Sequence, residues 1–386
     1  MKKIVSFLLA ALMIATAASL FSCSGKSELD LLREQIAGEL EGSYENDLAG
    51  TTLYVYNWGE YISDGEDDAL DVNAAFEAVT GIHVEYSTYD SNEAMYATLS
   101  GGGVEYDIVI PSDYMIERLI KEDRLEKIDY SKLQNYKYIG DDYKNLFYDP
   151  ENEYSVPYAV GYVCLIYNNT LVDPEDAKDQ SWSLMWNEKY KGQILGIDNA
   201  RDALAISMFS LGIDVNTEDP DEWDRAADHL AEAVPLFQGW AMDQVFQKME
   251  GENAAVAAYY AGDYFTMVYD MDEANGNGDH LSMYYPKEGT NVFYDACCIL
   301  KGSKNYEAAL LYIDFLMDPY VALQNAEYIH YACPNTAVTS NEEYSEYGND
   351  MLYPTSEVKA EAYRHLDDEV VKHYTDLWNK IKSSGK

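Results

Sequence analysis

The chain contains few basic residues: 26 Lys and Arg stand against 69 Asp and Glu among 386 residues, a formal net charge of −43. A surface of this sign repels nucleic-acid phosphates and anionic lipid headgroups, and it attracts cationic solutes. We therefore expect no nucleic-acid partner. Solubility alone would also explain the acidity, so the charge permits a cationic ligand without requiring one.

Cysteine and histidine are scarce, with five Cys and six His. Their spacing matches no metal motif such as two CxxC pairs, so we expect no metal and no cofactor. The chain also lacks a Gly-x-Ser-x-Gly elbow and a His-Glu-x-x-His motif, so we expect no catalytic residue and no enzyme. Four of the cysteines lie in the body of the chain: Cys164, Cys297, Cys298 and Cys333. They could form disulfides if the protein is exported from the cytoplasm, and burial as free thiols fits equally well.

The chain has no repeat with a period of about 20 to 50 residues, which argues against a solenoid. A hydrophobic content of 47% with 36 Tyr excludes a mostly disordered chain. The length is sufficient for two ordinary domains with sizeable cores.

The N-terminus reads as an export signal. Lys2 and Lys3 precede an apolar run over residues 4–20, which predicts a signal peptide over residues 1–22. The run ends in Leu-Phe-Ser-Cys, which resembles a bacterial lipobox with a lipidated Cys23, although Phe21 is bulkier than is usual there. A plain secretory signal or a single anchor helix is the alternative. With lipidation, residues 23–50 would form a tether, and the body would start near Thr51, outside the cytoplasm and touching the membrane only through its lipid.

Beyond residue 50, strand patterns alternate with helix patterns. Strands are expected over residues 52–56, 82–89 and 106–110, and helices over 71–79, from Ser91 to 99, and after Ser112. This alternation predicts an α/β domain with a largely parallel sheet. In such sheets ligands bind beyond the carboxyl ends of the strands. Trp58 and the Ser-Asp-Tyr run at residues 112–114 both fall at such ends.

The later chain repeats this pattern with two long extended runs. Residues 160–167 and 292–300 are apolar and could cross between domains. Strands are expected over residues 193–197, 254–260 and 281–285. Helices are expected from the stretch 198–202 to residue 211, over 221–233 and over 305–317, the last followed by Pro319. Residues 270–279 have the wrong acidic spacing for a calcium loop and are expected to form a turn.

The stretch Tyr-Asn-Trp-Gly-Glu-Tyr at residues 56–61 has the chemistry to hold an organic cation. The faces of Trp58 and Tyr61 attract a cation, by about 0.5–2 kcal/mol per ring. Glu60 could pair with an ammonium group through a charge-assisted hydrogen bond. The alternative places the two rings in the core or at its rim, with Glu60 solvated.

An ordered series of such stretches resembles the spermidine/putrescine-binding proteins of bacterial ABC importers. The series covers roughly residues 53–335. It comprises Tyr-Asn-Trp-Gly-Glu-Tyr (56–61), Tyr-Ser-Thr-Tyr-Asp-Ser-Asn-Glu (86–93), Tyr-Asp-Ile-Val-Ile-Pro-Ser (106–112), Tyr-Ser-Val-Pro-Tyr (154–158), Tyr-Lys-Gly (190–192), Asp-Asn-Ala-Arg-Asp (198–202), Pro-Lys-Glu-Gly (286–289) and Tyr-Ala-Cys-Pro-Asn (331–335).

The resemblance implies a two-lobed, type II periplasmic-binding-protein-like fold, with the ligand in a cleft between lobes joined by a hinge. The first lobe would comprise residues 51–161 and 294–339, and the second residues 162–293 and 340–386. It further implies a monomer that delivers a polyamine to an ABC permease and its ATPase subunit.

The resemblance also carries a set of ligand-binding positions, spread over both expected lobes. They are Trp58, Glu60, Tyr61, Ser112, Tyr114, Asn199, Asp202, Tyr260, Phe293, Asp295 and Tyr331.

Three of these positions depart from the family pattern, and three have a purely structural alternative. Asn199 stands where spermidine binders have an acid, and Tyr260 and Phe293 replace Trp, which weakens the cation–π contribution. Structurally, Ser112 could be only a helix N-cap, Asp295 could cap the hinge and Tyr331 could be a core residue.

The chemistry of a protonated di- or triamine fits these residue types. Its ammonium ends cannot be buried unpaired, so carboxylates belong at the ends. Its methylene stem gains about 0.8 kcal/mol per buried CH₂, so rings belong along the middle. The missing acid at Asn199 favours a diamine such as putrescine, unless Asp263 compensates.

Other readings of the same fold remain. One is a binding protein for another cationic or small organic solute, or for ferric ion, whose site would use clustered Tyr, His or carboxylate oxygens. Another is a surface adhesion lipoprotein or a sensor.

Overall fold

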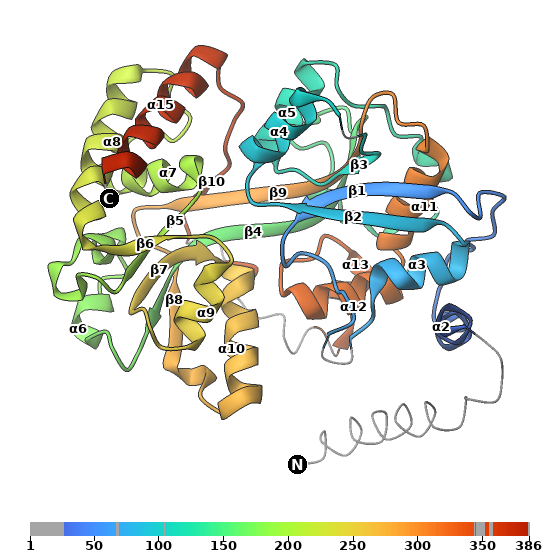
Figure 1. Ribbon diagram of the computed structural model, residues 1–386, viewed down its shortest axis with the longest axis horizontal. Helices are drawn as coiled ribbons and strands as arrows, with labels where there is room; N and C mark the ends of the chain where they lie inside the picture. The colour runs from blue at the N-terminus through green and yellow to red at the C-terminus, as the bar shows by residue number, and fades with distance from the viewer. Residues whose placement is uncertain are drawn as a thin grey trace.

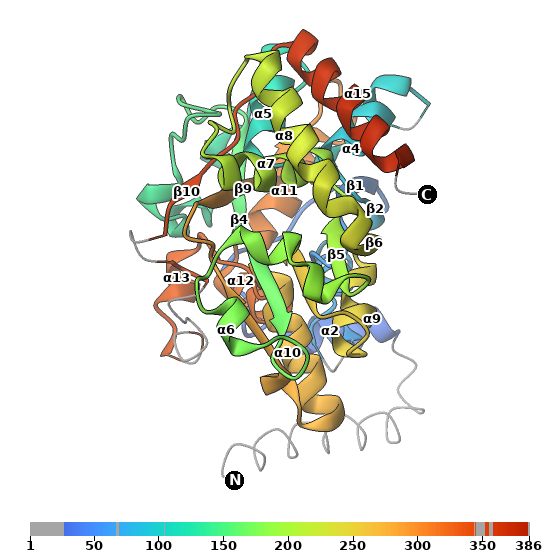
Figure 2. The same cartoon turned by 90° about the vertical axis from the view of Figure 1, so that its left-hand side faces the viewer.

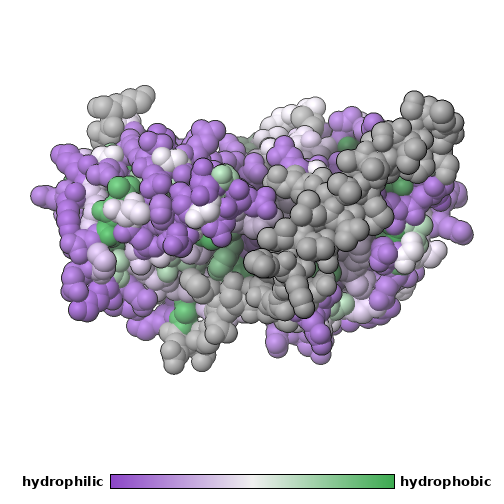
Figure 3. Space-filling model, turned by 90° about the horizontal axis from the view of Figure 1, so that it is seen from below, coloured by the Kyte–Doolittle hydropathy of each residue, from purple (hydrophilic) through white to green (hydrophobic). Residues whose placement is uncertain are grey.

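The computed structural model describes residues 27–66, 69–103, 105–342, 344, 352–354 and 358–384. The expected signal peptide and Cys23 lie outside these ranges. Within them, no helix is both long and apolar enough to span a membrane. The face seen in Figure 3 is largely hydrophilic, with only small apolar areas among its coloured residues.

The chain folds into two α/β lobes set side by side (Figure 1). In the first lobe the strands lie in the order β2-β1-β3-β9-β4, and β1 pairs in parallel with β2 and β3. Besides the ends of β4 and β9, its elements are α2 (Glu28–Ile36), β1 (Thr52–Trp58), α3 (Val72–Thr80), β2 (His83–Tyr89), α4 (Asn92–Gly101), β3 (Ile108–Val109), α5 (Asp113–Lys121), α11 (Tyr306–Leu316), α12 (Pro319–Ile329) and α13 (Thr336–Thr339).

The second lobe continues the same sheet in the order β4-β7-β5-β6, with β8 also paired to β4. The helix α15 packs beside α8 on the outside of this lobe (Figure 2). The elements are α6 (Pro174–Ala177), β5 (Ile194–Ile197), α7 (Ala200–Leu211), α8 (Pro220–Ala233), β6 (Phe237–Ala241), α9 (Gln244–Glu250), β7 (Val256–Tyr260), α10 (Ala261–Asn275), β8 (Leu281–Tyr284) and α15 (Asp368–Ser384).

Two long antiparallel strands, β4 (Ser155–Asn168) and β9 (Thr290–Ile299), run from one lobe into the other. β4 pairs with β9 up to Tyr162 and with β7 from Val163 onward. A third extended segment, β10 (Ala360–Glu361), pairs with the second-lobe end of β9. The sheet is therefore mixed rather than largely parallel, because these crossing strands enter each lobe antiparallel to its own strands.

Local capping explains several boundaries that the sequence predicted. The side chains of Asp71 and Ser91 cap the starts of α3 and α4 by accepting hydrogen bonds from Ala74 N and Ala94 N. Gly81 ends α3 in the left-handed conformation, with φ of 74°, that favours glycine. The expected strand at residues 106–110 is shorter, since only Ile108–Val109 pairs.

Several helices were missed by the sequence analysis, among them α9, α10, α12 and α15. Residues 270–275 are the last turns of α10 rather than a turn, and Gly276 is the left-handed cap that ends it. Pro319 does not merely stop α11, because it begins α12 behind the N-cap Asp318. Proline suits this first helical position since its missing N–H would have no helical partner there.

Residues 27–50 pack on the first lobe, although this part of the chain was expected to be tether. Ile36 and Tyr44 are buried in the first-lobe core. The buried carboxylate of Asp318 accepts hydrogen bonds from the backbone of Glu41 and Gly42 and from the Tyr44 hydroxyl, at 2.8–3.0 Å. The folded body therefore extends upstream of Thr51.

The four cysteines of the body are buried and unpaired in this structure. Cys297 lies in the first-lobe core, whereas Cys164 and Cys298 lie in the larger core that continues into the second lobe. The structure thus favours buried free thiols over disulfides.

Candidate functional site

A cavity lies between the lobes, where β1, β3 and β7 end and β4 and β9 cross. It encloses about 670 Å³, including space open to solvent at its mouth. All eleven positions predicted from the sequence line the cavity: Trp58, Glu60, Tyr61, Ser112, Tyr114, Asn199, Asp202, Tyr260, Phe293, Asp295 and Tyr331.

Asp295 is buried on β9 with one oxygen unsatisfied. The residue is 3% exposed, and within the described residues Oδ1 has no hydrogen-bond partner. Burial raises the pKa of Asp295 to about 7, against the opposing influence of the Ser112 and Tyr61 hydroxyls. A cation at this oxygen would supply the missing partner and favour the ionised form.

Ser112 sits at the N-cap position of α5, but its side chain makes no capping hydrogen bond. It lies across an isolated β-bridge from Asp295, so the hydroxyl is placed beside that carboxylate. The capping alternative therefore loses its support.

Asp202 lies on the first turn of α7, where the hydroxyls of two tyrosines hold its carboxylate. Tyr260 donates to Oδ2 and Tyr363 to Oδ1, both at 2.9 Å. Burial raises the pKa of Asp202 to about 6, although both hydroxyls act to lower it. Asn199 caps the same helix by accepting from the backbone N–H of Arg201 and of Asp202. The Asn199 oxygen is thus occupied, and a cation on this side would meet Asp202.

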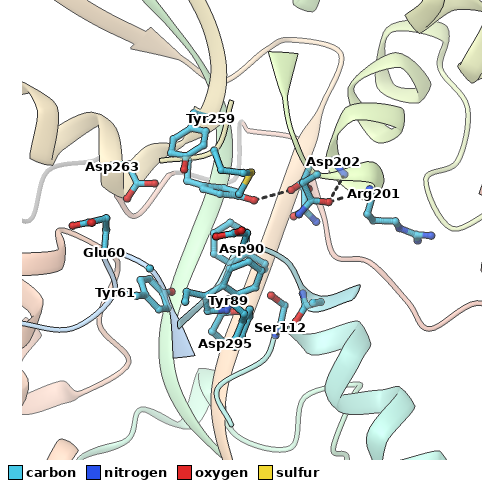
Figure 4. A pocket seen from close by; sticks show the side chains of 18 of the residues that line it. Glu60, Tyr61, Tyr89, Asp90, Ser112, Arg201, Asp202, Tyr259, Asp263 and Asp295 are labelled. Atoms are coloured by element: carbon cyan, nitrogen blue, oxygen red, sulfur yellow. Dashed lines mark hydrogen bonds between the residues drawn. The ribbon is translucent and has the colours of Figure 1, made fainter. Parts of the chain in front are cut away.

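Other carboxylates stand on the opposite side of the cavity. In Figure 4, Asp263 and Glu60 lie across from Asp202, with Asp90 and Asp295 between them. Burial raises the pKa of Asp263 well above its usual range. Burial and the neighbouring carboxylates of Asp243 and Asp64 raise the pKa of Glu60, which remains exposed at the rim. The cavity thus has acidic groups at both ends.

Aromatic rings form the walls between these acids. Tyr61 meets Tyr331 edge-on at 4.7 Å, and Tyr260 meets Phe293 edge-on at 5.4 Å between ring centroids. Trp58 leans on Tyr89 at 4.8 Å. In the described part of the chain, neither Trp58 Nε1 nor the Tyr61 hydroxyl has a hydrogen-bond partner, although both are buried. Buried polar groups without partners are costly, so both atoms are suited to bond to a ligand in the cavity.

Two glycines leave room for the ring walls. A Cβ on Gly262 would lie 2.4 Å from the Tyr331 ring, and one on Gly161 would lie 2.2 Å from the Phe293 ring. Neither glycine has a positive φ, so what matters is space rather than backbone conformation.

Gly262→Ala should displace the Tyr331 ring, which would weaken ligand binding, and lower the stability of the folded protein by about 1–3 kcal/mol, the usual cost of overpacking. Calorimetric titration measures the ligand affinity, and thermal unfolding measures the stability. Gly239→Ala is the matched control, since a Cβ there would meet nothing within 4 Å. Unchanged affinity in Gly262→Ala would show that Tyr331 does not need its present position.

The sequence analysis missed several residues of this cavity. Tyr89 ends β2 and Asp90 follows it, so both could have been found by the same strand-end rule that identified Trp58. Arg201 lies inside a quoted motif but was not singled out, and Tyr363 had no local signal. The remaining lining residues are Gly59, Asn92, Met242, Asp243, Tyr259, Asp263 and Asn291, of which only Asp263 had been considered.

Two lobes joined by crossing strands, with an acidic, ring-walled cavity between them, define a solute-binding protein of the periplasmic-binding class. No group of three or more His, Cys, Asp or Glu in the described ranges is arranged to hold a metal ion. The model of the bacterial extracellular solute-binding protein family matches residues 72–351. The chain belongs to this family, and it is a binding protein rather than an enzyme.

Named relatives lie close in sequence. The chain is 35% identical over 337 residues to the spermidine/putrescine-binding periplasmic protein of Escherichia coli, covering 86% of this chain and 92% of that protein. It is 30% identical over 365 residues to the putrescine-binding periplasmic protein SpuD of Pseudomonas aeruginosa, covering 92% and 97%.

Solved structures agree in fold. The substrate-binding protein PotD of a spermidine/putrescine ABC transporter from Streptococcus pneumoniae superposes with a TM-score of 0.68 at 34% identity, covering 87% of this chain and all of that one. The Tp0655 lipoprotein of Treponema pallidum has a TM-score of 0.72 at 25% identity, covering 86% and 99%. These structures establish the two-lobed binding fold. The periplasmic relatives establish an extracytoplasmic location.

Proposed function

We propose that this protein captures a polyamine, putrescine or spermidine, outside the cytoplasm and delivers it to an ABC permease driven by an ATPase subunit. The observation that carries the proposal is the placement of the acids. Asp202 lies on one side of a ring-walled cavity and Asp263 with Glu60 on the other, with the unsatisfied Asp295 between them. Ammonium ends would pair with the carboxylates, and the alkyl stem would pack against the rings.

The proposed lobes are residues 51–161 with 294–339, and 162–293 with 340–386. The change of partner along β4 between Tyr162 and Val163 supports this division. Since β4, β9 and the segment at β10 connect the lobes, bending there would open the cleft. The protein is proposed to act as a monomer.

Calorimetric titration of the mature chain with putrescine and with spermidine tests the function. Binding of either amine would support it. A lack of heat with both, while the protein is folded by circular dichroism, would assign the cavity to another solute. Ferric ion and a neutral amino compound are the further titrants for that outcome.

Asn199→Asp tests the preference for a diamine. Putrescine should bind the parent protein more tightly than spermidine, because the position carries an amide. The added carboxylate should raise spermidine affinity by about tenfold, as expected for a new charge-assisted hydrogen bond. Asp caps a helix as well as Asn does, so α7 should be unchanged. Tighter spermidine binding by the parent would mean that another acid, such as Asp263, meets the third charge.

A lipid anchor at Cys23 is part of the proposal. The lipobox-like run before Cys23 supports it. Cys23→Ser should release the protein from the membrane fraction, since the anchor would be the only membrane attachment. Fractionation with immunoblotting measures this. Continued sedimentation of the variant with membranes would favour an uncleaved anchor helix instead.

A further inference from the structure

Arg201 is almost completely buried beside the ligand cavity, with a side chain 2% exposed. Its Nη2 donates to the carbonyl of Val215 and to Asn216 Oδ1, at 3.0 and 3.1 Å. Within the described residues it forms no ion pair, and its Nε has no hydrogen-bond partner. In Figure 4 the side chain points away from the cavity, so the guanidinium is not placed to meet the ligand.

The guanidinium is surrounded instead by four aromatic rings. The distances from Arg201 Cζ to the ring centroids are 4.8 Å for Tyr363, 5.2 Å for Trp223, 5.6 Å for Tyr374 and 5.9 Å for Tyr114. Cation–π attraction is strongest where water is excluded, as it is here. A planar guanidinium can also stack on rings in a way that an ammonium cannot.

The rings of this cage come from both lobes and from the chain end. Tyr114 lies on α5 of the first lobe and Trp223 on α8 of the second. Tyr363 and Tyr374 belong to residues 358–384, which we call the C-terminal segment. Trp223 and Tyr374 also stack at 4.9 Å between centroids. The Arg201 cage thus brings together α5 of the first lobe, α8 of the second lobe and the C-terminal segment.

Three of the four rings also hold carboxylates through their hydroxyls. Tyr363 donates to Asp202 at 2.9 Å, so the ring that lies nearest Arg201 also orients the acid in the cavity. Tyr114 and Tyr374 both donate to Glu93 Oε1 on α4 of the first lobe, at 3.0 and 3.5 Å. The C-terminal segment and the first lobe therefore meet at Arg201 and at Glu93.

Ion pairs outside the cage follow the same boundary. Arg364 donates to Glu117 through Nε and Nη2, at 3.2 and 2.9 Å, and Arg118 meets Asp368 at 3.3 Å. Both pairs link α5 to the C-terminal segment. They are exposed on at least one side, so they add little by themselves. The Arg201 cage is buried, so water does not weaken its interactions as it weakens those of the exposed ion pairs.

We propose that Arg201 is a positioning residue, which couples ligand capture at Asp202 to docking of the C-terminal segment against α5 and α8. It acts through Tyr363 and Tyr114, not through contact with the ligand. The proposal rests on the proposed function for the ligand, but the docking half of it can be tested without any ligand.

Arg201→Lys keeps the charge and removes the planar fork, so it separates stacking from charge. We expect its polyamine affinity to fall by about tenfold, the scale of coupling through contact networks. Amide hydrogen exchange in the C-terminal segment should rise in the ligand-free protein. Arg225→Lys is the matched control, since Arg225 is exposed on α8, two residues after Trp223. It should behave like the parent protein in both measurements.

Tyr363→Phe keeps the ring in the cage and removes the hydrogen bond to Asp202. It should lose affinity while leaving exchange in the C-terminal segment unchanged. The pH dependence of binding should also move upward, because the Tyr363 hydroxyl lowers the pKa of Asp202. Other groups also act on the pKa of Asp202: Glu93 raises it, and Arg201 and Tyr260 lower it. Asp295 is the neighbouring acid of the cavity. Because Tyr363→Phe leaves all four groups in place, a shift in the pH dependence would report the loss of the Tyr363 hydroxyl.

Parent-like affinity and exchange in Arg201→Lys would overturn the proposal. Loss of thermal stability with unchanged affinity would also overturn it, since Arg201 would then be structural only. If the parent protein binds neither putrescine nor spermidine, the proposed function fails. Exchange in the ligand-free variants then still decides whether Arg201 docks the C-terminal segment.

Discussion

Asp295→Asn should weaken polyamine binding by about 2–5 kcal/mol, roughly 30-fold to several thousand-fold, the range for truncating one partner of a buried charge pair. The substitution keeps the size of the side chain and removes the charge. An ammonium group brought to Oδ1 would then be buried without a counter-charge, because the oxygen has no other partner among the described residues. Calorimetric titration with both amines measures the loss.

Asp228→Asn is the matched control for this substitution. Asp228 lies on the exposed face of α8, away from the cavity, and its replacement should leave the affinity unchanged. Thermal unfolding of ligand-free Asp295→Asn should be no lower than that of the parent, since an amide is not penalised by burial as an ionised carboxylate is. An Asp295→Asn protein that binds both amines normally would remove Asp295 from the site.

Polyamine affinity should fall steeply as the pH is lowered. With the pKa of Asp295 raised to about 7 and that of Asp202 to about 6, both acids take up protons in the free protein within the neutral range. A cationic ligand needs them ionised. Each protonated acid costs about tenfold in affinity per pH unit below its pKa, so the combined loss between about pH 8 and about pH 5 approaches a thousandfold.

The stability of the ligand-free protein should change in the opposite direction. The folded chain holds these protons more tightly than the unfolded chain, in which an Asp has its ordinary pKa. Their stabilising contribution is therefore complete below that ordinary value and is lost as the pH rises through about 6 to about 7. Thermal unfolding of parent and Asp295→Asn across this range isolates the contribution of one acid from that of the net charge. Identical pH profiles for the two proteins would contradict the assignment.

Much of the cavity could be predicted from the sequence because its residues follow regular strands. Trp58 is the last residue of β1 and Ser112 lies three residues beyond β3, and parallel strands place such residues at one edge of the sheet. Helix caps such as Ser91 could be predicted because they depend on residues only a few positions away. The resemblance to a known family supplied the second-lobe positions, which no local pattern would have joined to the first.

The missed features depend on contacts between distant parts of the chain or on ambiguous local signals. Tyr363 reaches Asp202 across 161 residues, and no spacing rule connects them. Residues 270–276 combine acids with Asn-Gly, which is equally typical of a turn and of a helix that ends at a left-handed glycine. The structure has the helix, because α10 packs against α9 and α12 as well as against the sheet.

With a lipid at Cys23, the burial of Asp318 would limit how far the protein could move from the membrane. Its carboxylate holds residues 41–44 on the first lobe, and α2 begins behind the N-cap Ser27. If Cys23 carries lipid, only four peptide units would separate the anchor from folded structure, a reach of at most about 14 Å. The first lobe would then stay close to the bilayer surface, and opening of the cleft would move the second lobe relative to it. A protein tethered in this way would bind solute only within a thin layer above the membrane. It would also have little freedom to rotate, so its N-terminus would restrict which of its faces can meet the permease.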